Sequence, residues 1–227
     1  MSTAVLSVTL PELIVPSRRL GRHVEHDPAS KAFAVAEASA PKPVQWERRC
    51  PVLDQGDLGS CTGNSAAGWL GTDTATRPGL ATVDEDQAVA FYSVATHHDR
   101  ARGVYPPDDT GSSGLAAAKA LKLAGHCHTY RHAFSVKAAL TALQAGPVMV
   151  GMAWLTGCDE PDRLGHITYR GQVRGGHEIL FDGYDGKGVW ATNSWGEGWG
   201  RAGRFWLSLD DFAKALANQG DVVSPTA

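Results

Sequence analysis

The pattern of apolar residues changes at Gly146, and this change constrains the fold more than any other feature of the chain. Before it, alanine-rich stretches carry apolar side chains at helical spacing, and we expect helices at about 61–74, 84–98, 114–124 and 135–145. After it, short apolar runs are bounded by glycines. These predict strands at 148–154, 165–173, 177–184, 188–192 and 203–207, followed by a short helix at 208–216. A helical half followed by a strand half predicts an α+β fold.

The composition is that of a globular protein. With 227 residues, 43% hydrophobic and 20% charged, the chain can form one large domain or two small lobes around a real core. A formal net charge of −3 without long runs of like charge argues against nucleic acid as a partner. No apolar run approaches the roughly 18 residues that span a bilayer. Residues 1–30 also lack the basic start of a secretory signal, so we expect a cytoplasmic protein with no membrane partner.

The first 45 residues differ from the rest of the chain. They are rich in proline and alanine and have little periodic apolar pattern, which predicts an arm, or a short pro-segment, that lies over the body or stays partly mobile. We expect the main domain at 46–227, with a helical lobe at about 46–145 and a β lobe at 146–227.

Cys61 stands in a glycine-rich turn directly before the first predicted helix. Gly59 and Gly63 allow the backbone to approach a ligand, and the positive end of the helix dipole favours a thiolate. Gln55 lies six positions earlier, where its amide and the Cys61 N–H could form two donors for an oxyanion. A buried structural thiol is the alternative interpretation.

His177 and Asn193 supply the other two groups that a thiol nucleophile needs. Gly175 and Gly176 precede the histidine and an apolar strand follows it, while Asn193 ends the next strand of the expected hairpin. The two side chains can therefore meet, with the amide oxygen holding the imidazole. A nucleophile, a base and a group that orients the base together predict a thiol hydrolase.

These sequence islands resemble the papain-like cysteine peptidases, over about residues 46–208. The matching residues are Gln55-Gly56, Gly59-Ser60-Cys61, His177, Asn193-Ser194-Trp195-Gly196 and Gly198-Trp199-Gly200. The resemblance implies a two-lobe fold with the active-site cleft between the lobes. It also implies a peptide or protein substrate and no metal or organic cofactor.

Carried over to this chain, the resemblance makes Cys61 the nucleophile and His177 the general base and then acid. Asn193 orients the imidazole, Gln55 completes the oxyanion hole, and Trp195 shields the His–Asn hydrogen bond from water. The function so implied is hydrolysis of peptide bonds through an acyl-enzyme.

Four residues are expected to contact the substrate: Gly114, Gly176, Glu178 and Trp195. Glu178 either points into the cleft, where it would change the substrate preference, or points away. Leu58 replaces a cysteine that usually forms a disulfide in this family, and Thr62 replaces an aromatic residue. The chain therefore looks like a divergent member of bacterial or phage type, without the usual long propeptide and disulfides.

Other chemistries fit the sequence less well. The loop 109–114 has the look of an aspartic-protease loop, but that chemistry needs two such aspartates and the chain has one copy. The histidines at 126, 128 and 132 match no zinc spacing, so no metal site is predicted. Two functional alternatives stay open: another acyl-transfer or deconjugating thiol enzyme on the same fold, and a non-catalytic peptide-binding relative. The sequence does not fix the oligomeric state, nor whether Cys50, Cys127 or Cys158 forms a disulfide.

Overall fold

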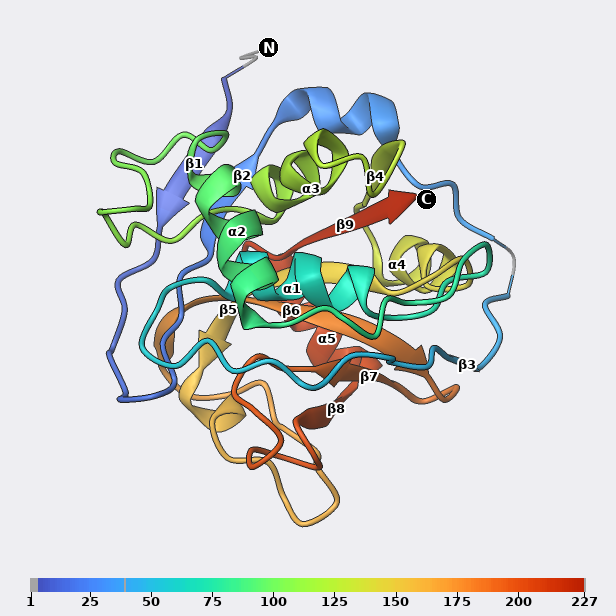
Figure 1. The fold of residues 1–227 in the computed structure, drawn as a ribbon. Helices are drawn as coiled ribbons and strands as arrows, with labels where there is room; N and C mark the ends of the chain where they lie inside the picture. The colour runs from blue at the N-terminus through green and yellow to red at the C-terminus, as the bar shows by residue number, and fades with distance from the viewer. Residues whose placement is uncertain (1–3, 39, 227) are drawn as a thin grey trace.

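A curved antiparallel sheet forms the centre of the fold (Figure 1). The computed structural model describes residues 4–38 and 40–226. The strands run in the order β4 (Thr129–Ala133), β9 (Asp221–Thr226), β5 (Val148–Leu155), β6 (Val173–Tyr184), β7 (Gly188–Thr192) and β8 (Arg204–Ser208), and β3 (Val44–Gln45) pairs with β6. Every pairing is antiparallel, as expected for strands joined by hairpins and meanders.

Three helices lie over one face of this sheet: the first and third contact the sheet, and the second packs on those two (Figure 1). They are α1 (Cys61–Leu70), α2 (Glu85–Thr96) and α3 (Gly114–Leu123). The side chains of Asp84 and Ser113 accept hydrogen bonds from the first turns of α2 and α3, so local sequence fixes where these helices begin. Two further helices, α4 (Val136–Ala142) and α5 (Leu209–Ala217), contact each other, and the side chain of Ser208 caps α5.

Strand alternation divides the interior into two hydrophobic cores. In β5 and β6, Met149 and Leu180 join the core of α1–α3, whereas Val150 and Phe181 join the core with α4, α5 and most of the tryptophans. Successive residues of a strand point to opposite faces, so one pair of strands serves both cores. The predicted α+β fold with two lobes is confirmed. Although we expected residues 135–145 in the helical lobe, α4 packs with the sheet core.

Several element predictions need correction. The strand expected at 165–173 is wrong: these residues form an irregular loop tied to β8 by the bond from Ile167 N to the carbonyl of Trp206, and β6 begins only at Val173. The helix expected to reach residue 74 ends at Leu70. Strands β4 and β9 were not predicted, since β4 is largely polar and β9 contains Pro225.

The N-terminal region contributes two strands and passes between the lobes. β1 (Leu6–Thr9) pairs with β2 (His23–His26), and a 3-10 helix, η1 (Pro28–Phe33), follows. Leu20 and Val24 are fully buried, so this part of the predicted arm is packed in place. A second 3-10 helix, η2 (Thr156–Cys158), follows β5. Within the described part of the chain, no helix is long and apolar enough to cross a membrane.

Candidate active site

Cys61 is the first residue of α1 and is fully buried. The start of the helix is held by a chain of side-chain hydrogen bonds: Ser60 Oγ donates to Asn64 Oδ1 at 2.8 Å, and Asn64 Nδ2 donates to Glu85 Oε1 at 2.7 Å. Glu85 also accepts from the backbone N–H of Asp54 at 3.0 Å. The turn that carries Cys61 is therefore fixed to the first turn of α2.

His177 lies in β6 and bonds to Asn193, directly after β7. The His177 Nε2 and Asn193 Oδ1 atoms are 2.7 Å apart. The backbone N–H of Ser194 donates to the same Oδ1 at 2.8 Å, which identifies this atom as the amide oxygen. Nε2 of the neutral imidazole is therefore the protonated nitrogen, and Nδ1 keeps its lone pair. Nδ1 is buried and has no hydrogen-bond partner among the described residues.

Tryptophans enclose this pair. The indole of Trp195 stacks on the imidazole with ring centres 5.0 Å apart, and the edge of Trp154 meets it at 4.9 Å. The side chain of Asn193 is itself 3% exposed, so water has almost no access to its bond with His177. Trp195 was predicted as a shield; Trp154 was not, because nothing in the sequence of β5 distinguishes it from a core residue.

Burial shifts the pKa values of Cys61 and His177. It lowers the pKa of His177 to about 3; the bond to Asn193 partly offsets this, and the charge of Arg174 adds to it. Burial also raises the pKa of the Cys61 thiol, and a hydrogen bond from the backbone of Glu178 offsets part of the change. In this closed structure both groups are neutral at pH 7, because desolvation outweighs the helix dipole that we expected to favour a thiolate.

Gln55 connects the turn before α1 to the residues after β7. Its Oε1 accepts from Ser194 Oγ at 2.5 Å, and its backbone N–H donates to the Ser194 carbonyl at 2.9 Å. Nε2 donates one hydrogen to the Leu58 carbonyl at 2.8 Å. An amide nitrogen carries two hydrogens, so the second remains for another acceptor.

A segment from Glu12 to Val24 runs through the groove between the lobes. The Gly176 carbonyl accepts from the N–H groups of Gly21 and Arg22 at 3.1 and 2.9 Å. On the opposite wall, Ser112 N donates to the Gly21 carbonyl at 2.8 Å and its carbonyl accepts from His23 N at 2.6 Å. We call residues 12–24 the covering segment, because they lie against the residue next to His177.

Close packing explains why glycines line this groove. A Cβ on Gly176 would collide with the carbonyl of Arg22, and one on Gly111 would collide with that of Gly21. Gly176 therefore contacts the chain's own extended covering segment, and its contact with a substrate stays a prediction. Gly114 makes no backbone bond to the segment; Ser112 does so instead, and no sequence signal distinguishes it because only its backbone takes part.

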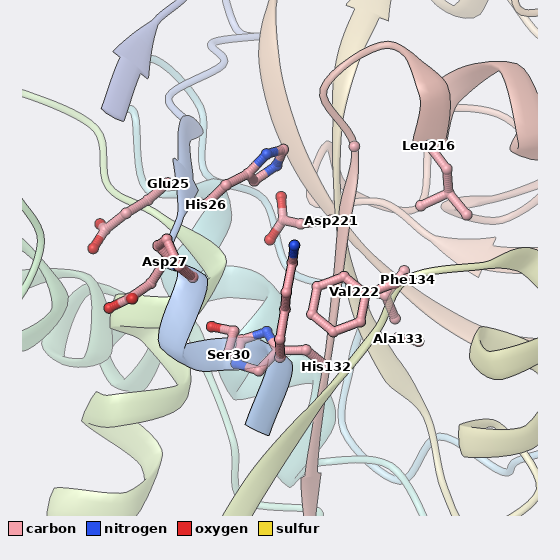
Figure 2. A pocket seen from close by; sticks show the side chains of 13 residues that line it. Glu25, His26, Asp27, Ser30, His132, Ala133, Phe134, Leu216, Asp221 and Val222 are labelled. Atoms are coloured by element: carbon pink, nitrogen blue, oxygen red, sulfur yellow. The ribbon is translucent and has the colours of Figure 1, made fainter. Parts of the chain in front are cut away.

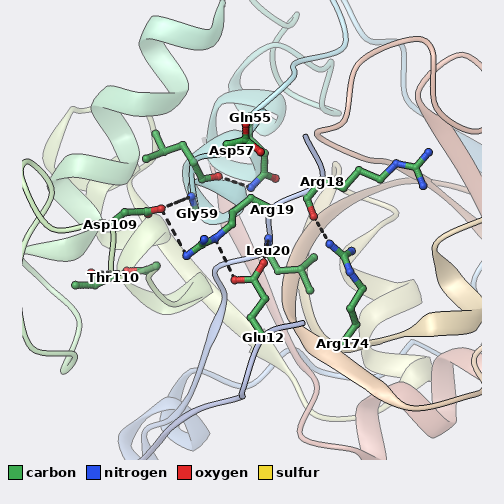
Figure 3. A network of polar contacts seen from close by, with 12 residues as sticks. Glu12, Arg18, Arg19, Leu20, Gln55, Asp57, Gly59, Asp109, Thr110 and Arg174 are labelled. Atoms are coloured by element: carbon green, nitrogen blue, oxygen red, sulfur yellow. Dashed lines mark hydrogen bonds and ion pairs between the residues drawn. The ribbon is translucent and has the colours of Figure 1, made fainter. Parts of the chain in front are cut away.

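Charged residues fix the covering segment at its edges (Figure 3). Arg19 lies 3.1 Å from Glu12 Oε2 and 3.8 Å from Asp109 Oδ2. Glu12 Oε1 also accepts from the N–H of Leu20 at 2.8 Å. Asp109 in turn accepts from Gly59 N at 3.1 Å and from Tyr92 Oη at 2.7 Å. Asp109 thus holds the groove together, rather than serving as one of a catalytic pair of aspartates.

The other candidates from the sequence were a metal site and disulfide bonds. No group of three or more potential metal ligands occurs within residues 4–38 and 40–226. The four cysteines, Cys50, Cys61, Cys127 and Cys158, are all free and buried.

Comparison with known proteins identifies the fold. No protein-family model matches the sequence, and no curated protein matches it. Among solved structures, xylellain, a cysteine protease from Xylella fastidiosa, is similar with a TM-score of 0.72 and 16% identity, covering 96% of this chain and 99% of that one. Digestive procathepsin L 3 of Tenebrio molitor larval midgut is similar with a TM-score of 0.64 and 16% identity, covering 93% of this chain and 76% of that one.

A third structure is more distant. The Carica candamarcensis cysteine protease CMS1MS2, in complex with E-64, has a TM-score of 0.57 and 17% identity, covering 82% of this chain and 99% of that one. At these identities the likeness defines the fold: the chain has the two-lobe fold of the papain-like cysteine proteases.

Proposed function

We propose that this protein is a cysteine peptidase in which Cys61 attacks the peptide carbonyl and His177 transfers the proton. The observation that carries the proposal is the imidazole geometry: Nε2 is bound to Asn193 at 2.7 Å beneath Trp195, and Nδ1 is left without a partner. Cys61 lies against the backbone of Glu178, the residue that follows His177. A base held in one tautomer beside a thiol is what nucleophilic catalysis by cysteine requires.

The reaction then proceeds in two steps. The Cys61 thiol gives its proton to Nδ1 of His177 and its sulfur bonds to the carbonyl carbon. The imidazolium protonates the leaving amine, and an acyl-enzyme remains. His177 next takes a proton from water, whose oxygen displaces the thiolate and releases the acid. The second Nε2 hydrogen of Gln55 and the Cys61 N–H are the proposed donors to the oxyanion.

We further propose that the covering segment keeps the protein latent. Cys61 and His177 are both fully buried while the segment is in place, so no substrate can reach them.

The test is hydrolysis of a peptide library by the full chain with a specific protease site inserted after Ala40. We expect little cleavage before nicking, and cleavage that depends on Cys61 after nicking and dilution. The same chain with Cys61→Ala is the control. Transfer of the acyl group to added amines in preference to water would favour the acyl-transfer alternative. Binding of peptides with no turnover in the nicked chain would favour the non-catalytic one.

A further inference from the structure

Three neighbouring strands place two carboxylates on either side of a glycine. Gly151 in β5 pairs with Glu178 in β6 on one side and with Asp221 in β9 on the other. Residues directly opposite one another in a sheet project to the same face, and here this is the face that α1 and α3 cover. Because Gly151 has no side chain, a pocket with acidic walls lies above it; we call it the acidic pocket.

The guanidinium of Arg22 occupies the acidic pocket. Its Nη2 donates to Asp221 Oδ1 and, at 2.8 Å, to the Gln219 carbonyl, and the Arg22 side chain is fully buried. A Cβ on Gly151 would collide with Arg22 Nε and come within 2.5 Å of Asp221 Oδ1 and 2.8 Å of Glu178 Oε2. Only glycine at this position leaves room for the arginine.

Glu178 has unused binding capacity in this pocket. The residue is 1% exposed, yet neither oxygen of its carboxylate has a hydrogen-bond partner among the described residues. Burial raises the pKa of Glu178, repulsion from Asp221 raises it further, and the charge of Arg22 lowers it. A buried carboxylate without a partner is costly unless a ligand satisfies it. Glu178 therefore marks the pocket as a site for a group rich in N–H donors.

The acidic pocket lies beside the proposed nucleophile. Glu178 directly follows His177 in β6, and its backbone lies against the Cys61 thiol, whose pKa it lowers. The charges of Glu178 and Arg22 both act on the pKa of Cys61. A side chain in this pocket therefore belongs to a peptide that passes the nucleophile.

Asp221 has a route to water that Glu178 lacks. It lines a cavity of about 460 Å³ together with residues of β2, η1 and β4 (Figure 2). In that view its carboxylate lies beside His26, and its side chain is 15% exposed. Asp221 can therefore stay hydrated when no arginine occupies the pocket.

From this arrangement we infer that the acidic pocket selects an arginine side chain of the substrate, and that Arg22 fills it in the latent form. The inference rests on the proposed peptidase function and names its substrate class. A guanidinium presents five N–H donors in a plane and can serve carboxylates on two walls at once, whereas an ammonium acts as a point charge. Arginine is therefore preferred over lysine, and both over neutral side chains.

The experiment uses the full chain with the protease site after Ala40, nicked as above, and with Arg22→Ala, which vacates the pocket and leaves its walls intact. A peptide library is digested and the cleavage sites are sequenced by mass spectrometry. One matched pair of peptides, with Arg or Gln at the selected position, then gives a ratio of kcat/KM values. We expect arginine to be enriched at one position and the ratio to be roughly 10–100, the effect of a charge-assisted hydrogen bond.

Glu178→Gln and Asp221→Asn are each expected to lower that ratio about tenfold, in line with the loss of one charged partner. Asp86→Asn, an exposed carboxylate in the first turn of α2, is the matched control and should leave the ratio unchanged. Two separate wall variants are used so that one remains informative if the other does not fold. Cooperative unfolding in denaturant shows that a variant is folded.

Cleavage that depends on Cys61 but shows no preference for arginine would overturn the acidic-pocket inference and leave the peptidase function standing. A preference that survives both wall substitutions would do the same. Absence of any cleavage that depends on Cys61 would instead overturn the peptidase function, and the inference with it.

Discussion

The hydrogen-bonded pair of His177 and Asn193 and the covering segment are both buried, but they are buried in different ways. His177 and Asn193 lie among tryptophans, and their mutual bond at 2.7 Å is enclosed by the core of the β lobe. The covering segment is held by backbone hydrogen bonds to Gly176 and Ser112 and by ion pairs at its edges, besides the buried side chains of Leu20, Arg22 and Val24. Water can replace the backbone and edge contacts of the segment far more readily than it can reach the enclosed bond between His177 and Asn193.

Because of this difference, the intrinsic reactivity of Cys61 and its exposure to reagents should depend on different residues. Changes around His177 should alter the reactivity of Cys61 whether the groove is open or closed. Changes in the covering segment should alter how often Cys61 is exposed and leave its intrinsic reactivity unchanged. Each of the following predictions acts on one of the two regions, and so tests whether they are independent.

Removal of the imidazole should have the largest effect. In the nicked chain, His177→Ala is expected to lower peptide hydrolysis by about 10²–10⁴-fold, the usual contribution of a general acid–base group. Hydrolysis rates at substrate concentrations well below KM, which give kcat/KM, measure this loss. His166→Ala, in the irregular loop before β6, is the matched control and should change the rate little. A similar loss in both variants would remove the special role of His177.

Acid should destabilise the closed chain through His177. Its pKa is about 3 in the closed structure and about 6.5 in an unfolded chain. Between these values the unfolded chain binds a proton that the closed chain does not. The free energy of unfolding should therefore fall by about 1.4 kcal/mol per pH unit as the pH drops from about 6.5 towards 3, and be fully retained above 6.5.

Denaturant titrations of wild type and His177→Gln across this pH range measure the effect. The variant should lack this part of the slope. Buried His132, whose pKa burial also lowers, contributes equally to both proteins. His97→Gln, at an exposed position, is the control. Identical slopes in wild type and His177→Gln would contradict the closed, neutral imidazole.

Adding a single carbon atom to the covering segment should open the groove. A Cβ on Gly21 would collide with the carbonyl of Gly59, so Gly21→Ala is expected to raise the alkylation rate of Cys61 about 10–100-fold, from roughly 1–3 kcal/mol of overpacking. Gly198→Ala, where a Cβ meets nothing within 4 Å, is the matched control. Equal alkylation rates in the two variants would mean that the segment does not limit access.

The ion pairs of Arg19 should matter least. Its side chain is 27% exposed, and such pairs contribute at most about 1 kcal/mol, so Arg19→Ala should raise the alkylation rate no more than about fivefold. The gain should shrink in high salt, which screens exposed charges. An effect larger than that of Gly21→Ala would mean that charge, not backbone packing, holds the segment.

Local patterns predicted the helices and the α+β class well, because regular apolar spacing and a cap such as Ser135 are properties of neighbouring residues, whereas the two-lobe fold was implied by the family resemblance. The strand β9 was missed for the opposite reason. Its residues are ordinary alone and become a strand only by pairing with β4 and β5, which lie far away in the sequence.

The residues of the candidate site likewise divide into those that local sequence predicted and those that it did not. His177 and Asn193 carry chemistry in their side chains, so their types and surroundings predicted that they would meet. Ser112 acts through its backbone, and Arg22 lies in a region without periodic pattern, so no local signal pointed to either. The direction of Glu178 was left open, because only the pairing of β6 with β5 and β9 fixes it.

The most direct test of the account is the alkylation of all four cysteines by iodoacetamide at pH 6, followed by mass spectrometry. Burial raises the pKa of Cys127 to about 11 and that of Cys158 to about 12, so both should react slowly. We predict that Cys61 is slow in wild type, reacts at least about tenfold faster than Cys127 or Cys158 in Gly21→Ala, and is slow again when His177→Ala is added. If Cys61 in Gly21→Ala reacted no faster than Cys127 and Cys158, or stayed fast without His177, the activated pair beneath a covering segment would be contradicted.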